Sequence, residues 1–84
     1  MYRLIPDAPT MEQVAALPEE ALLPYAEVLS VLEVTPWVGR SLHEANPDGA
    51  VRRWTFGPDE AGQVIYLIYE DRLEVHLLLV QWLA

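Results

Sequence analysis

The chain has 84 residues and no cysteine, so we expect one domain, residues 1–84, without a disulfide framework or a thiolate metal site. Thirteen acidic residues against five arginines and no lysine give a net charge of −8, which repels nucleic acid and anionic membranes as an average field. Any contact with RNA would therefore need a local basic patch. The absence of a signal-like N-terminus and of a long apolar run predicts a cytoplasmic protein with no membrane partner.

The N-terminal part predicts one strand and one short helix. Residues 2–5 are β-prone and are ended by Pro6. Thr10 and Gln13 have the spacing of a capping box, in which each side chain satisfies a backbone N–H at the start of a helix. The spacing predicts that Thr10 opens this helix and that Pro18 stops it.

The second predicted helix is the main amphipathic one. Two glutamates at 19–20 follow Pro18, as in a helix with proline at its first position. Apolar side chains then recur at three- and four-residue spacing, namely Leu22, Tyr25, Ala26, Leu29 and Leu32. Pro24 removes a backbone hydrogen bond, so we expect a kink or a late start there. The pattern ends at 35–36.

The C-terminal half changes from a helical period to a period of two. Residues 39–50 are rich in glycine, asparagine, proline and aspartate and predict a loop. Strands are predicted at 51–56, 63–69 and 73–83, joined by GPDEAG and by a tight turn at 70–72. The predicted fold class is α+β: an N-terminal strand, a two-helix hairpin and a three-stranded antiparallel meander.

Both faces of the last two predicted strands are apolar. Strict alternation sets Val64, Tyr66 and Ile68 against Ile65, Leu67 and Tyr69, and sets Leu77 and Leu79 against His76, Leu78, Val80 and Trp82. Two helices can cover only one face of the sheet, so we expect the other to meet a second copy of the chain or another protein. The predicted partner-binding residues are Tyr69, Leu78, Val80 and Trp82.

This order of elements resembles the RelE/ParE superfamily of toxins from type II toxin–antitoxin systems. The resemblance covers nearly the whole chain and is found in MYRLIPD, ALPEEALLPYAEVLSVLEVTPWVGR, AVRRWTFG and QVIYLIYEDRLEVHLLLV. It implies a RelE/ParE-like fold and an antitoxin protein as partner. For the members that cleave mRNA it also implies the ribosome as a partner.

The resemblance also implies where a nuclease site would lie. Family mRNases place basic residues on the concave face of the sheet, with a histidine or tyrosine near the C-terminus, to stabilise a pentacoordinate phosphate. Arg53 matches the first strand arginine, but Thr55 and Gln63 stand where further arginines are usual, and the chain ends VQWLA. Arg40, Arg53 and His76 remain as candidate catalytic residues, which amounts to a reduced site.

Arg52 and Arg53 are adjacent, so alternation places them on opposite faces of a strand, where they cannot form one patch. Solvated or acid-paired side chains are the favoured interpretation, with a contact to a carboxylate-bearing partner or to phosphate as the alternatives. A structural role is favoured for His43 and His76, since no third ligand has suggestive spacing. We predict no metal and no cofactor.

Three functions stay open at this point. The first is a toxin-like component of a toxin–antitoxin system that acts mainly through protein binding and has a degraded nuclease site. The second is a ribosome-dependent mRNA endonuclease using Arg40, Arg53 and His76. The third is a non-toxic, dimeric interaction module. In all three, the expected partner is an antitoxin or a second copy, and free nucleic acid is not an expected partner.

Overall fold

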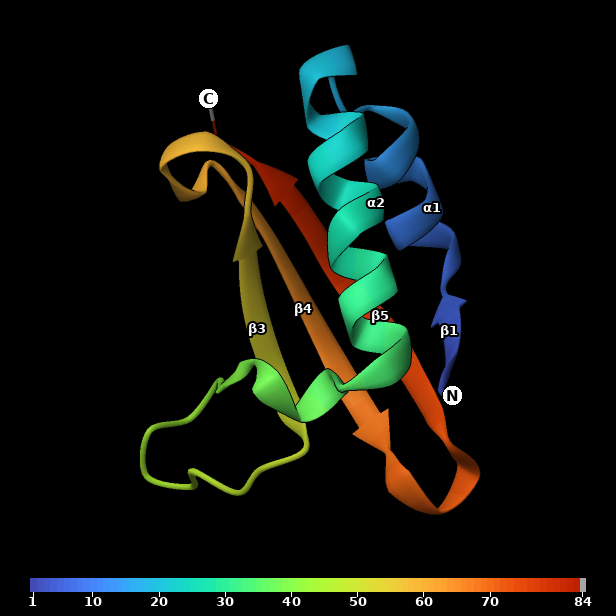
Figure 1. The fold of residues 1–84 in the computed structure, drawn as a ribbon, viewed down its shortest axis with the longest axis vertical. Helices are drawn as coiled ribbons and strands as arrows, with labels where there is room; N and C mark the ends of the chain where they lie inside the picture. The colour runs from blue at the N-terminus through green and yellow to red at the C-terminus, as the bar shows by residue number, and fades with distance from the viewer. Residues whose placement is uncertain (84) are drawn as a thin grey trace.

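The computed structural model describes residues 1–83 as a five-stranded sheet with two helices packed against it (Figure 1). The elements in chain order are β1 (Arg3–Pro6), α1 (Ala8–Ala15), α2 (Glu19–Val34), β2 (Arg40–Ser41), β3 (Val51–Phe56), β4 (Gly62–Tyr69) and β5 (Glu74–Trp82). The strand order is β1-β5-β4-β3-β2, with β1 parallel to β5 and every other pair antiparallel. The predicted α+β class with its C-terminal meander is confirmed. Neither helix within residues 1–83 has the length and apolar character needed to cross a bilayer.

One strand was not predicted. β2 is only two residues long and lies within the predicted loop at 39–50, where turn-forming residues dominate. It pairs with the middle of β3, so that Arg40 lies opposite Arg53 and Ser41 opposite Arg52. A strand of this length has no periodicity to detect, because a period of two needs at least four residues to be visible.

The predicted cap of α1 is wrong. Asp7 caps the helix, and its carboxylate accepts the Thr10 N–H at 2.8 Å. The Thr10 hydroxyl is instead buried and donates to the Leu77 carbonyl at 3.0 Å, while the Gln13 side-chain oxygen accepts the Val80 N–H at 2.8 Å. These bonds satisfy backbone groups of β5 near and beyond the end of β1, and so α1 covers a strand edge that would otherwise be free to pair with another chain.

The helix α2 begins at Glu19 and runs without a break through Pro24, so the predicted late start is wrong. Its buried side chains are Ala21, Tyr25, Val28 and Leu32. Leu22, which the predicted stripe included, is 48% exposed. The helix therefore turns a narrower apolar face to the sheet than its composition suggests, because several of its leucines and valines face outward.

The core lies between α2 and one face of the sheet. Tyr66 at the centre of β4 is fully buried, and its hydroxyl donates to the Pro36 carbonyl at 2.6 Å. Burial raises the pKa of Tyr66 to about 12. A side chain at Gly39 would collide with this hydroxyl and would approach the Arg53 carbonyl to 2.9 Å. The turn into β2 therefore requires glycine at position 39.

A β-bulge in β5 overturns part of the predicted face assignment. Ile65 pairs with Leu79 and the next residue of β4 pairs with Leu77, so Leu78 is the extra residue. Beyond the bulge the two faces of β5 are exchanged. Val80 is therefore in the core at 3% exposure, and the Trp82 ring lies 6.0 Å from that of Phe56. The prediction that Val80 and Trp82 share a face with His76 is wrong, since strict alternation cannot reveal a bulge.

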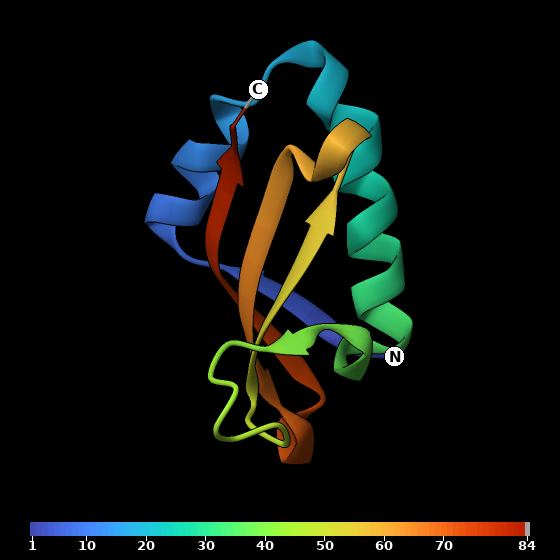
Figure 2. The same ribbon diagram turned by 90° about the vertical axis from the view of Figure 1, so that its left-hand side faces the viewer.

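The sheet consequently has one face covered by helix and one that is not. Figure 2 shows α2 along one side of the sheet and α1 beside the end of β5. The opposite side, called the open face below, is formed by Arg53, Ile65, Leu67, Tyr69, Glu74, His76 and Leu79. None of these residues belongs to the buried core cluster.

Glu70, in the turn between β4 and β5, ties three distant segments together. Its carboxylate accepts the Tyr2 hydroxyl at 2.6 Å and the Trp37 indole N–H at 2.6 Å. The hydrogen bond from Tyr2, followed by that from Trp37, lowers the pKa of Glu70 below its ordinary 4.5. The start of the chain, the segment after α2 and the β4–β5 turn are thus joined through one ionised side chain.

Glu70→Gln is expected to weaken the acid dependence of stability. A carboxyl whose pKa is lower in the folded chain stabilises the fold above its unfolded pKa, and this contribution is lost as pH falls through the folded pKa. In thermal unfolding between about pH 7 and pH 3 the wild type should lose more stability than Glu70→Gln, with the difference developing below pH 4.5. Parallel curves for the two proteins would contradict this role.

Candidate functional site

Arg40 and Arg53 form a pair of cations on the open face. They are direct partners across β2 and β3, and the side chains of both are exposed. Among residues 1–83 neither makes a salt bridge, although thirteen acidic residues are available in the chain. Like charges directly opposite one another on a sheet are destabilising, so this pair costs stability unless an anion binds to it.

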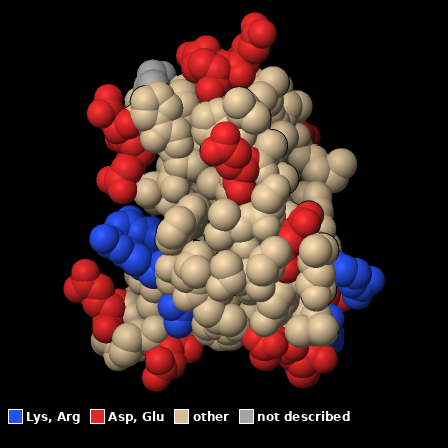
Figure 3. All heavy atoms as spheres, in the orientation of Figure 1, with Lys and Arg blue, Asp and Glu red and all other residues tan. Residues whose placement is uncertain are grey.

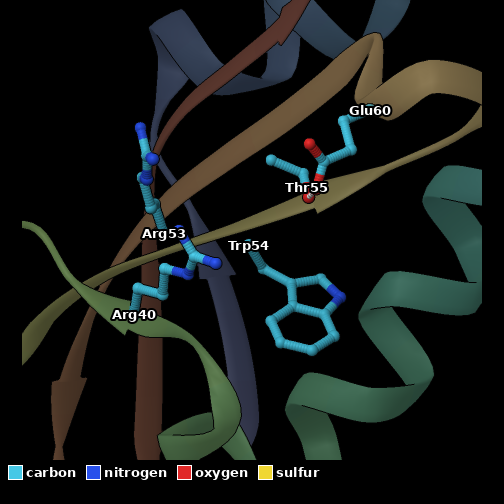
Figure 4. Close-up of a pocket in the computed structure, with 5 residues that line it drawn as sticks. All are labelled: Arg40, Arg53, Trp54, Thr55 and Glu60. Carbon is cyan, nitrogen blue, oxygen red and sulfur yellow. Dashed lines mark hydrogen bonds between the residues drawn. The ribbon is translucent and has the colours of Figure 1, made fainter.

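Two hollows on the surface share these arginines. One, of about 380 Å³, is lined by Arg40, Arg53, Trp54, Thr55 and Glu60 (Figure 4). The Thr55 hydroxyl donates to the Glu60 carboxylate at 3.1 Å, at the end of the hollow away from the arginines. The other, of about 440 Å³, is lined by Arg40, Ser41, Leu42, Glu44, Pro47 and Arg53. The arginine pair can therefore be approached from both sides of β2.

Arg52 has a different role, which the sequence did not reveal. It faces the helix-covered side opposite Tyr66 and donates at 2.9 Å to the carbonyls of Gly39, Pro47 and Gly49. Its guanidinium also lies 4.9 Å from the centre of the Trp37 ring. Arg52 is thus a half-buried side chain that forms no salt bridge within residues 1–83 and holds both ends of the loop at 39–50 together.

The site is positioned by a continuous set of contacts. Glu70 accepts the Trp37 N–H, and the Trp37 ring stacks on Arg52, which in turn binds the Gly39 carbonyl beside Arg40. A two-residue strand would not hold Arg40 in place by itself, because it forms too few backbone bonds. These side-chain contacts fix the loop from which Arg40 projects.

His76 is not brought together with the arginine pair. It lies on β5 opposite Leu67, whereas Arg53 lies on β3 opposite Ile65. Its Nε2 lies 3.0 Å from the Glu74 carboxylate, and its ring packs edge-on against Tyr69 at 4.7 Å. It lines neither hollow.

Glu74 is the centre of this second cluster. It is 9% exposed, and it accepts hydrogen bonds from His76 and from Arg3, which forms a salt bridge with it. The hydrogen bond from His76 is the largest influence that lowers its pKa, and the charges of Arg3 and Arg72 act in the same direction. The arrangement keeps Glu74 ionised as a partner for the surrounding basic groups.

The four predicted partner-binding residues are divided between the faces. Tyr69 lies on the open face and is half-buried, and Leu78, the bulged residue, is 40% exposed. Val80 and Trp82 lie on the helix-covered side. Within residues 1–83, no three potential metal ligands of the histidine, cysteine or carboxylate type are clustered.

Comparison with known proteins identifies the fold. No family model matches the chain, and neither does any curated protein. The isolated E. coli RelE toxin superposes with a TM-score of 0.72 at 14% identity, covering 100% of this chain and 86% of that one. The intact E. coli RelBE toxin–antitoxin complex contains a chain that superposes with a TM-score of 0.75 at 14% identity, covering 98% of this chain and 96% of that one. The predicted RelE/ParE-like fold is confirmed.

The two neighbouring arginines should respond differently to substitution. Arg52→Gln removes charge-assisted hydrogen bonds to three carbonyls and should lower the free energy of unfolding by about 2 kcal/mol. Arg53→Gln is the matched control: it removes an exposed, unpaired side chain and should change stability by less than about 0.5 kcal/mol. Urea unfolding of both variants measures the difference, and equal losses would contradict the role assigned to Arg52.

Proposed function

We propose that this chain is the toxin-type member of a toxin–antitoxin pair and acts mainly by binding another protein through the open face. Its main support is the combination of a RelE fold over the full length with two arginines on the open face that form no salt bridge within residues 1–83. An arginine without a carboxylate partner is suited to bidentate contact with a carboxylate on a second protein. An antitoxin is the first such partner that we propose.

Protein binding is favoured over RNA cleavage by what surrounds the arginines. Stabilising a phosphorane requires several positive groups at one point, together with a group that moves the proton. Here the neutral Gln63 side chain donates to Gln81 at 2.9 Å, and His76, two strands away from Arg53, is hydrogen-bonded to Glu74.

A ribosome-dependent mRNA endonuclease remains the second candidate. The observation in its favour is the arginine pair itself. Arg40 and Arg53 form no ion pair within residues 1–83 and could together bind one phosphate of an RNA backbone. In this candidate the general base would have to come from outside the arginine pair. The two candidates predict different fates for cellular transcripts.

Tightly controlled expression in a bacterial host separates the candidates. We expect growth arrest with intact transcripts, and relief of that arrest by Arg40→Gln or Arg53→Gln at equal protein levels. Losing one charge-assisted contact should weaken the binding of a partner by about ten- to a hundred-fold. Growth and the 5′ ends of transcripts are measured together. Leu23→Glu changes the net charge equally on the exposed helix side and should keep the arrest.

Two outcomes would count against the proposal. Unimpaired growth with soluble protein would contradict toxicity. New 5′ ends within coding regions, absent in Arg53→Gln, would favour the endonuclease.

A further inference from the structure

The arginines of this acidic chain are gathered around the open face. Arg52 holds a loop on the other side, but Arg40 and Arg53 form what we call the first basic end, on β2 and β3. Arg3 lies on β1 opposite Glu74, and Arg72 lies 5.1 Å from the centre of the Tyr69 ring. Together with His76, these two arginines form the second basic end.

Within the second basic end, Arg72 is the arginine that the internal pairing leaves without a salt bridge. Glu74 is the carboxylate at its centre, and it already accepts bonds from Arg3 and His76. Arg72 contacts Tyr69 through its guanidinium and forms no salt bridge among the described residues. A guanidinium stacked on a ring still has its N–H donors free for an anion.

An apolar strip joins the two ends. It consists of Ile65, Leu67, Tyr69, Leu78 and Leu79, none of which is part of the core. From Ile65, beside Arg53, to Tyr69, beneath Arg72, the strand advances four residues, which is about 13 Å. The two basic ends are therefore separated by a distance that a short peptide can span.

The helix-bearing side has the opposite character. Figure 3 shows acidic atoms spread over that side, with the basic atoms near its left and right edges. The acidic residues of the helices and of the α1 cap are Asp7, Glu12, Glu19, Glu20, Glu27 and Glu33. Six of the thirteen acidic residues thus belong to the helices and the α1 cap. Beside the open face, Arg40, Arg53 and Arg72 form no salt bridge within residues 1–83, which suits this face to an acidic partner.

Other occupants fit this face less well. A second copy packed face to face would set basic ends against basic ends, since both ends of the face carry the same sign. RNA would meet a protein of net charge −8 whose free arginines are divided by an apolar strip with one aromatic ring, Tyr69, for stacking. A polypeptide can match both the apolar strip and the charges beside it.

We propose that the open face binds an extended segment of a partner protein with apolar side chains in its middle and a carboxylate at each end. At about 3.3 Å per residue, the two carboxylates would lie about four to six residues apart in the segment. One would bind Arg40 and Arg53 and the other Arg72, with the apolar residues over Leu67 and Leu79. The inference rests on the proposed function only in that the partner is a protein.

Selection from a random dodecapeptide display library against the full purified chain tests this directly. Enriched peptides should have two acids about four to six residues apart with apolar residues between them. In fluorescence anisotropy, Arg53→Gln and Arg72→Gln should each raise the dissociation constant of a selected peptide by about tenfold or more. Changing the acid at one end of the peptide should remove its sensitivity to only one of these variants. Leu23→Glu, with the same change in net charge, should bind as wild type.

Each contrary result has a defined meaning. No enriched peptide, peptides without the paired acids, or binding unaffected by either variant would overturn the inference. So would enrichment of a random RNA pool on the open face with no enriched peptide, which would assign the face to nucleic acid. Growth arrest with intact transcripts together with a failed peptide selection would leave the proposed function standing. An open face that selects only RNA would contradict the proposed function as well, and acid-flanked peptides without growth arrest would support the binding surface alone.

Discussion

The hydrogen bonds from Arg52 to the carbonyls of Gly39, Pro47 and Gly49 are the contacts on which the rest of the site depends. The loop at 39–50 has only a two-residue strand to attach it to the sheet, and Arg40 is half of that strand. By closing the loop on itself and stacking on Trp37, Arg52 keeps Arg40 opposite Arg53. The hydrogen bonds of the half-buried Arg52 thus hold the two exposed arginines opposite one another despite their like charge.

The charge distribution explains how so acidic a chain can present a basic surface. The core is built on one side of the sheet, where α2 covers Val64, Tyr66 and Ile68, and the acidic residues of the helices face away from it. Among residues 1–83 no helix covers the other side, and four of the five arginines surround it. Apolar strand residues that stay half-exposed between cations add little to the stability of a small domain. A role in binding therefore accounts for this face better than a role in stability does. The RelE fold fixes where that face lies, while the side chains of this chain decide what it can bind.

Much of the fold could be predicted from the sequence, because strong periodicity and prolines mark the helices and the three long strands. Features set by tertiary contacts could not be predicted. The bulge at Leu78 exchanges the faces of β5 without leaving a trace in an alternating apolar strand. Thr10 and Gln13 match a capping box, yet both side chains form hydrogen bonds to the backbone of β5 instead of capping the helix. Of the candidate site, the sequence named Arg40, Arg53 and His76, but it could not show that Arg40 pairs with Arg53, because β2 is too short to predict, or that His76 lies two strands away from Arg53.

If the open face serves to bind a different protein, a second copy of the chain should not cover it in solution. The molar mass in solution, measured by light scattering over a wide range of concentrations at physiological ionic strength, tests it most directly. Because both ends of the open face are basic, a face-to-face pair of copies would bring like charges together, and the account predicts the mass of a single chain throughout. A dimer that persists on dilution, and that Leu79→Glu on the apolar strip converts to monomer, would show that a second copy covers this face and would contradict the account.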